Sequence, residues 1–307
     1  MIDCSCDISF SNTGRANCVP VFSIARKIIV VPMYDSTGAK NKVSTASVLT
    51  HTTINGLINQ ADRSKRWYPL PKVKNAKFPK GEPTYQEFED GSKKFVKTGV
   101  RTGEMMFVDS VTPSFVGVLN GGKCTELGVY IVDNKGNLLG YTYGETGSLY
   151  PVPLNKSTMD AIFEFATDAT VTNSMLKFEF DVDLEDAYLR MIKADSITGL
   201  NLLNVNGLID VYSVNTAVSQ TSHKTKLFLD EGDLVEPIAV TGLVAADFAL
   251  FNVTGSAAVT ISTCVESPAG TYTFTYASQT LTNVLRITPT KASYDFTNVI
   301  ANTHIVA

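Results

Sequence analysis

The sequence predicts a mainly β protein with one or two short helices, and three observations support this class. Only 18% of its residues are charged and 44% are hydrophobic. Thr, Val, Ser, Asn and Gly are abundant, which suits strands joined by turns better than long helices. Several short segments alternate between apolar and polar residues and end at Gly, Pro or Asp. At 307 residues the chain is longer than most single domains, so two domains are expected.

The first half is predicted to contain a strand, two helices and a hairpin, in that order. Residues 26–32 form a short apolar run that ends at a proline, as a strand would. Residues 44–61 carry Ile and Leu at helical spacing, and Thr112 followed by Pro113 predicts the start of a second, short helix. The segments 127–132 and 138–143 flank a turn-forming stretch and predict a β-hairpin.

The second half is expected to contain further strands. Residues 175–183 alternate cleanly, with apolar side chains on one face and charged side chains on the other. Glu185 and Asp186 predict the start of a short helix that continues through Ile192, and residues 208–229 predict one or two strands.

A change in composition near residue 233 predicts a domain boundary. After the acidic turn at 230–233, only six residues between 236 and 307 are charged. This last part contains short strands at even spacing, separated by Gly and Pro, as in a small β-sandwich. We therefore expect a larger β domain over 1–232 and a β-sandwich over 233–307.

The C-terminal part resembles the bacterial immunoglobulin-like domains that are appended to phage virion proteins. The resemblance rests on residues 240–248, 258–262 and 266–274, which carry the short motifs of such domains. The chain lacks the Cys, Trp and Cys core of antibody domains, so the likeness is one of architecture.

The first 230 residues are similar to phage tail tube proteins. The likeness rests on a predicted helix followed by residues 64–69, on residues 88–97, and on the order of elements from Met175 to Leu229. It implies a tail-tube-like β-sandwich or barrel that assembles into stacked hexameric rings, which enclose a conduit for DNA. It also implies contacts with other tail proteins of the virion, and synthesis in the host cytoplasm.

No residue pattern predicts an enzyme, a metal site or a cofactor. His51, His223 and His304 have no partner at ligand spacing, and the motifs of nucleophilic elbows and phosphate-binding loops are absent. Cys4 and Cys6 form a Cys-x-Cys pair, and Cys18 is the only further cysteine near them in sequence. Three cysteines are too few ligands for a closed metal site, which needs four. The five cysteines are spread over the chain and are expected to be reduced. The N-terminus has no secretory signal and no apolar run is long enough to span a membrane, so no membrane partner is expected.

The charged face of the strand at 175–183 has two interpretations. The first is a plain solvent-facing strand over a core. The second is that the face lines the lumen of an assembled ring, where carboxylates would repel passing DNA without binding it. The residues of that hypothesis are Lys177, Glu179, Asp181 and Asp183.

The segment from Arg63 to Arg101 holds 11 of the 26 Lys and Arg residues, together with four prolines. It predicts a long extended arm. The arm is expected to dock on another subunit, with Trp67 and Tyr68 as buried anchors. Lys72, Lys74, Lys77 and Lys80 would pair there with acids of the neighbour. The alternative is a single-stranded nucleic acid binder with stacking aromatic residues.

The function expected from the sequence is that of a structural virion protein, the major tail tube protein of a phage. A capsid decoration protein or a tail terminator protein is an alternative of the same class. An adhesin or carbohydrate-binding module of another origin would also suit the C-terminal β-sandwich, although the missing signal argues against export.

Overall fold

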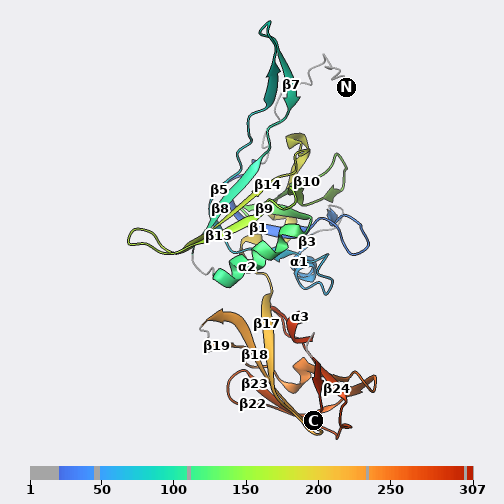
Figure 1. Ribbon diagram of the computed structural model, residues 1–307. Coiled ribbons are helices and arrows are strands. Elements are labelled where there is room, and N and C mark those ends of the chain that lie inside the picture. The colour runs from blue at the N-terminus through green and yellow to red at the C-terminus, as the bar shows by residue number, and fades with distance from the viewer. Residues whose placement is uncertain (1–20, 45–48, 109–111, 233–234, 301–302, 307) are drawn as a thin grey trace.

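A computed structural model describes residues 21–44, 49–108, 112–232, 235–300 and 303–306 (Figure 1). Cys4, Cys6 and Cys18 lie outside these ranges. The predicted mainly β class is confirmed, since 47% of the residues lie in strands and 13% in helices. Among the described residues, no helix has the length and hydropathy needed to span a membrane.

The elements of the N-terminal part run from residue 25 to residue 204. Its strands are β1 (Ala25–Pro32), β2 (Val43–Ser44), β3 (Leu49–Thr50), β4 (Tyr68–Pro69), β5 (Val73–Lys77), β6 (Thr84–Glu87), β7 (Lys93–Lys97), β8 (Thr102–Val108), β9 (Leu127–Asp133), β10 (Leu138–Tyr141), β11 (Ser148–Leu149), β12 (Val152–Pro153), β13 (Asp160–Glu164), β14 (Asn173–Glu179), β15 (Leu189–Ile192) and β16 (Ile197–Thr198). Its helices are α1 (His51–Ile58) and α2 (Pro113–Gly121), with 3₁₀ turns at Gly122–Cys124, Asp186–Tyr188, Ala194–Ser196 and Leu202–Asn204.

The elements of the C-terminal part begin at residue 209. They are β17 (Ile209–Val218), β18 (Ser222–Gly232), β19 (Pro237–Ala239), β20 (Phe248–Asn252), β21 (Ala257–Val259), β22 (Ile261–Glu266), β23 (Thr271–Tyr276), β24 (Val284–Pro289), β25 (Tyr294–Asp295), β26 (Thr303–Ile305), the helix α3 (Thr297–Ile300) and a 3₁₀ turn at Ala245–Asp247.

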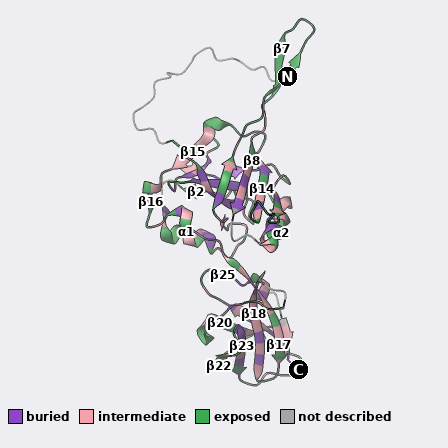
Figure 2. Cartoon of the chain, turned by 90° about the vertical axis from the view of Figure 1, so that its left-hand side faces the viewer, coloured by how far each residue is buried: buried purple, intermediate pink, exposed green. Residues whose placement is uncertain are grey.

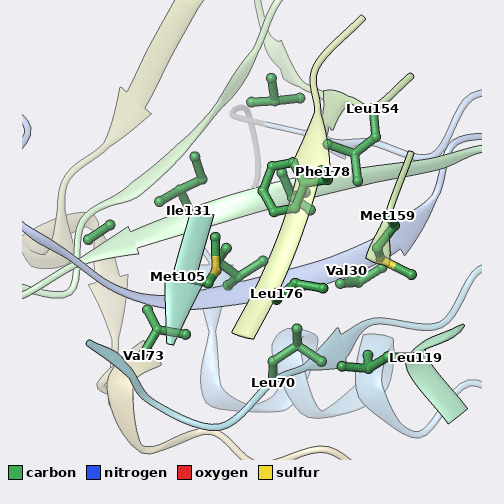
Figure 3. Packing of buried hydrophobic residues seen from close by; sticks show 14 of the residues in the cluster. Val30, Leu70, Val73, Met105, Leu119, Ile131, Leu154, Met159, Leu176 and Phe178 are labelled. Atoms are coloured by element: carbon green, nitrogen blue, oxygen red, sulfur yellow. The ribbon is translucent and has the colours of Figure 1, made fainter. Parts of the chain in front are cut away.

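The N-terminal body is a β-sandwich of two sheets. One sheet has the strand order β15-β10-β9-β1-β4, and the other has the order β13-β14-β8-β5. Side chains such as Val30 and Ile131 from the first sheet pack against Met105, Leu176 and Phe178 from the second (Figure 3). This shared core explains why the apolar residues of β14 alternate with exposed ones.

The sheet that contains β1 is buried on both faces. Its second face carries Ile29, Tyr130 and Val132, which form a separate core with Ile54 and Ile58 of α1. A strand that is covered on both sides needs apolar residues at every position, which accounts for the unbroken run of residues 28–31.

Local sequence signals account for two of the three helices predicted in the N-terminal part. Helix α1 lies within the predicted range 44–61 but spans eight residues, and the Thr50 and Thr53 side chains form a reciprocal cap at its start. Helix α2 begins as predicted, because the Thr112 side chain caps it and Pro113 occupies its first turn. The hairpin of β9 and β10 is also confirmed.

The predicted helix at residues 185–192 is wrong. A 3₁₀ turn at Asp186–Tyr188 leads instead into β15, which pairs with β10 over four residues. The open edge of β10 offers hydrogen bonds to this segment, and this tertiary pairing overrides the helical signal of the two acids.

The C-terminal part is a second β-sandwich with its own core. One sheet has the order β22-β23-β18-β17-β25 and the other has the order β21-β20-β24-β26. The boundary predicted near residue 233 is corrected by this topology. Val211 and Leu227 of β17 and β18 pack in the same core as Phe274 and Ile287, so the packing changes between residues 208 and 211.

An ionic joint links the two parts of the molecule. Asp295 of the C-terminal part accepts hydrogen bonds from Arg66 and from Arg63, the latter at 2.8 Å, and both Arg66 and Asp295 are buried. Burial would raise the pKa of Asp295, but hydrogen bonds from Thr297 and from the two arginines outweigh it and hold that pKa well below its usual range. Asp295 therefore stays ionised between the two cores.

Candidate assembly surfaces

The outward face of the sheet β13-β14-β8-β5 contains two of the four predicted lumen residues. Lys177 is exposed and Glu179 is half-buried on the outward side of β14. Asp181 and Asp183 lie after the end of the strand, where the Asp183 backbone N–H donates to the Asp181 carboxylate at 3.0 Å. Val182, expected on the apolar side, is exposed. The prediction of a four-residue charged face along one strand is therefore corrected, because the chain turns after Phe180.

Opposite charges alternate across the four strands of this sheet. The pairing register places Asp160 of β13 opposite Lys177 of β14, and Lys177 opposite Glu104 of β8. The same register places Glu104 opposite Lys77 of β5. Cross-strand neighbours of opposite charge stabilise a sheet. This row of Asp160, Lys177, Glu104 and Lys77 is called the charge row below.

The outward face as a whole is nearly balanced in charge. Its acids are Asp160, Glu104, Glu164 and Glu179, and its lysines are Lys74, Lys77 and Lys177. The four acids exceed the three lysines by one charge, and Lys123, which pairs with Asp160 at 2.5 Å, offsets it. The face is therefore much less acidic than the sequence of β14 alone indicates.

The two edges of this sheet differ. Among the described strands, none pairs with the outer edge of β5 or of β13. On β13, however, the Asn120 side chain of α2 donates to the Ala161 carbonyl at 2.8 Å and accepts from the Ala161 N–H at 2.9 Å. An amide offers one donor group and one acceptor, so it satisfies the backbone as a neighbouring strand would. We call this pair of bonds the Asn120 clamp.

The residues predicted as anchors of the basic arm belong to the body instead. Trp67 is only 3% exposed and packs against Tyr130, with their ring centroids 4.9 Å apart. Tyr68 is half-buried and donates to the Arg63 carbonyl at 3.1 Å. An anchor for another subunit has to be exposed in the free chain, so the anchor role of Trp67 is corrected.

The lysines predicted to pair with a neighbour are divided between two places. Lys74 and Lys77 lie on β5, whose irregular pairing includes a bulge between them, whereas Lys72 lies 3.4 Å from the Asn204 side chain. Lys80 and Arg101 pair with Asp186, at 3.2 and 2.8 Å. Burial would raise the pKa of Asp186, but hydrogen bonds from Arg101 and Lys80 lower it. This cluster fixes the base of the segment that follows.

That segment is a hairpin of β6 and β7 that projects from the body (Figure 1). Each residue from 82 to 97 is exposed, as the green segment in Figure 2 shows. Tyr85 and Phe95 are 53% and 50% exposed and contact each other edge to face, with ring centroids 6.0 Å apart. At its base the two chains approach so closely that a Cβ on Gly99 would lie 1.9 Å from the Gly81 carbonyl oxygen. This projecting hairpin is the part of the predicted arm that leaves the body.

The hairpin of β13 and β14 also extends away from the body (Figure 1). Phe165, just after β13, is 79% exposed and contacts Phe163 with ring centroids 5.3 Å apart. The sequence alternation predicted strands here, but it did not reveal the exposed aromatic side chain. Aromatic side chains are enriched at contact surfaces, so the exposed aromatic pairs on these two hairpins are candidates for contact with a partner.

No metal-binding group of three or more His, Cys, Asp or Glu side chains occurs among the described residues. The three histidines, which have no partner at ligand spacing in the sequence, differ in their surroundings. His51 is exposed on α1, whereas His223 is buried beside His304. The absence of an enzymatic activity stays a prediction.

Comparisons with known proteins do not assign the chain to a family. A scan against protein family models finds no match. A search of curated proteins finds no matching relative.

Proposed function

We propose that the protein is a structural component whose copies assemble with one another, and that it serves as the major tail tube protein of a phage. The observation that carries the proposal is the projecting hairpin, since Tyr85 and Phe95 have no core to pack into. A two-stranded hairpin on its own is at best marginally stable in water. A partner surface that covers its aromatic pair would supply the missing stabilisation.

A second copy of the chain is the partner that the rest of the body favours. No described strand covers the outer edge of β5 or of β13, and an open edge can template pairing with another chain, although on β13 the Asn120 clamp already occupies Ala161. Contact between two different edges is head-to-tail, and it closes into a ring when the rotation between copies allows it. In this arrangement the sheets of successive copies form one barrel wall.

The charged outward face would then line the inside of the ring. Its acids and lysines alternate, so it would present DNA with no continuous positive surface, and each acid repels phosphate over about 8–10 Å at physiological salt. DNA would pass without specific binding. Lys177 and Glu179 remain proposed lumen residues, whereas Asp181 and Asp183 would lie toward a rim.

The two hairpins and the C-terminal β-sandwich have different roles in this proposal. The projecting hairpin reaches beyond its own body and would contact the next ring of the stack. The C-terminal β-sandwich is attached through the ionic joint and would decorate the outside of the tube as an immunoglobulin-like module. Assembly into rings and tubes requires no bound cofactor.

Negative-stain electron microscopy of the purified protein tests the proposal directly. We expect hollow rings of six-fold symmetry, or tubes of stacked rings, at micromolar concentration. Single particles of monomer size at every concentration and salt condition would contradict the proposal. Closed caps or isolated trimers would favour a capsid decoration protein instead.

A further inference from the structure

The charge row ends in opposite charges at the two edges of its sheet. Asp160 lies on the edge strand β13, and Lys77 lies on the edge strand β5. Between them, Lys177 and Glu104 complete a strict alternation of negative and positive side chains. Lys77 is exposed and Asp160 is half-exposed, so both are accessible at their edges. A second copy placed beside the first would extend this alternation without a break.

We infer that Lys77 of one copy lies beside Asp160 of the adjoining copy and that this contact sets the register between copies. This inference rests on the proposed assembly into rings and names the residues that join them. A closed ring would then carry an unbroken circle of alternating charges. A shift by one residue would turn one side chain of each pair to the other face of the sheet. A shift by two would place Lys77 beside Ile162, so the charges select one register.

Because of the Asn120 clamp, side chains rather than backbone groups must make the contact with the adjoining copy at this point of the β13 edge. Its amide occupies the outward N–H and carbonyl groups of Ala161, the residue next to Asp160. An incoming strand therefore cannot form backbone hydrogen bonds with Ala161 while the clamp is in place. Asp160 already pairs with Lys123 at 2.5 Å, and a carboxylate has acceptor capacity for a second lysine.

A neighbouring position on the same strand lacks this complementarity. Lys74 lies in the next row of the outward face, opposite Met106, and its row continues through Met175 to Ile162 on β13. Lys74 would therefore meet an apolar residue of the next copy. It is the matched control, since it shares the strand, the face and the charge of Lys77.

The test exchanges the charges at the two edges. Lys77→Glu and Asp160→Lys are prepared separately, and ring formation is followed by analytical ultracentrifugation and electron microscopy. Each variant alone places like charges together at every contact, and we expect it to need about tenfold more protein than the wild type to form rings. An equimolar mixture should recover wild-type assembly, because every contact between the two variants again joins one positive and one negative side chain.

Controls separate this contact from folding and from the proposed function. Lys74→Glu should assemble as the wild type does, and circular dichroism with thermal unfolding shows whether each variant is folded. Asp160→Asn, which avoids repulsion by Lys123 and Lys177, should give a smaller loss. If the wild type assembles and Lys77→Glu assembles equally well, the inference is overturned while the proposed function stands. Failure of the mixture to recover assembly also overturns it, and a wild type that never assembles overturns both.

Discussion

His223 is a buried residue whose surroundings favour its neutral form. Its Nε2 lies 2.8 Å from Oδ1 of Asn215, and Nδ2 of Asn215 lies 2.7 Å from Nε2 of His304. The other side of the His223 ring faces the uncharged Phe274. Nδ1 of His223 is buried and has no hydrogen-bond partner among the described residues, so a proton on it would be left unpaired. Burial, followed by the nearby His304, lowers the pKa of His223 to about 3.

This environment predicts an acid-sensitive C-terminal β-sandwich. Between about pH 6.5 and pH 3 the unfolded chain binds a proton at His223 that the folded chain does not, so stability falls as the pH falls. His223 alone should lower the free energy of unfolding by up to about 1.4 kcal/mol per pH unit in this window and contribute no slope above it. Urea unfolding of wild type and His223→Gln at several pH values measures this slope. Equal slopes in the two proteins would contradict it.

Residue-level roles were only partly predictable from the sequence. The alternation around Phe178 follows from local pattern, and the structure places those side chains in the core as expected. The clamp between Asn120 and Ala161 joins residues 41 positions apart, and the pair of Arg66 and Asp295 joins residues 229 positions apart. No local pattern encodes such contacts. Trp67 was misjudged for the same reason, since its partner Tyr130 is remote in sequence.

At the scale of elements, the sequence predicted best those that are stabilised by their own residues. The hairpin of β9 and β10 depends on a turn in which Asp133 accepts hydrogen bonds from Lys135 and Asn137, and helix α2 depends on its Thr112 cap. The segment at 189–192 is a strand because it pairs with the edge of β10, so its local helical signals gave a wrong prediction. Pairing partners, rather than propensities, decide such segments.

The projecting hairpin gives a prediction for an element. Replacing residues 84–97 with two glycines removes only exposed side chains. The free energy of unfolding of the body should therefore change by less than about 0.5 kcal/mol. Assembly should stop at single rings, because the contact with the next ring is lost. Electron microscopy checks this, and tubes of wild-type length would contradict the stacking role.

A deletion of residues 70–84 is the matched contrast. It removes Leu70 and Val73, which are buried in the core, together with strand β5. Loss of two buried aliphatic side chains costs about 4 kcal/mol or more, so this variant should unfold rather than assemble selectively. Comparing the two deletions separates the role of the hairpin from that of the body.

At the scale of the whole molecule, the ionic joint determines how the two β-sandwiches are held. Arg66 and Asp295 are each 7% exposed in their side chains, whereas Arg63 is 48% exposed. Removing one partner of a buried ion pair leaves an uncompensated charge, which costs about 3 kcal/mol, while an exposed arginine contributes less than about 1 kcal/mol.

We therefore predict that Arg66→Met loosens the joint and that Arg63→Met does so much less. In Arg66→Met, small-angle scattering should show a broader distribution of distances, and limited proteolysis should cut faster at residues 205–209. Both β-sandwiches should retain their circular dichroism, since each has its own core. Equal scattering profiles for both variants and the wild type would show that the joint is dispensable.

The division of the molecule shows why composition alone misplaced the boundary. Charged residues become sparse only after residue 233, but the lysine-bearing strand β18 already pairs with β23 over five residues. Its inward side chain Leu227 completes the C-terminal core, while its lysines lie on the other face. A change in surface charge and a change in packing partner are different boundaries.

The Asn120 clamp gives the molecule a direction. A sheet with two equally open edges can join a copy of itself through two like edges or through two unlike edges. Two β13 edges meet poorly, since each presents Ala161 with its backbone groups already occupied, and two β5 edges would bring lysines against lysines. In the proposed assembly these two mismatches favour contact between unlike edges, so the proposed tube would have two unlike ends.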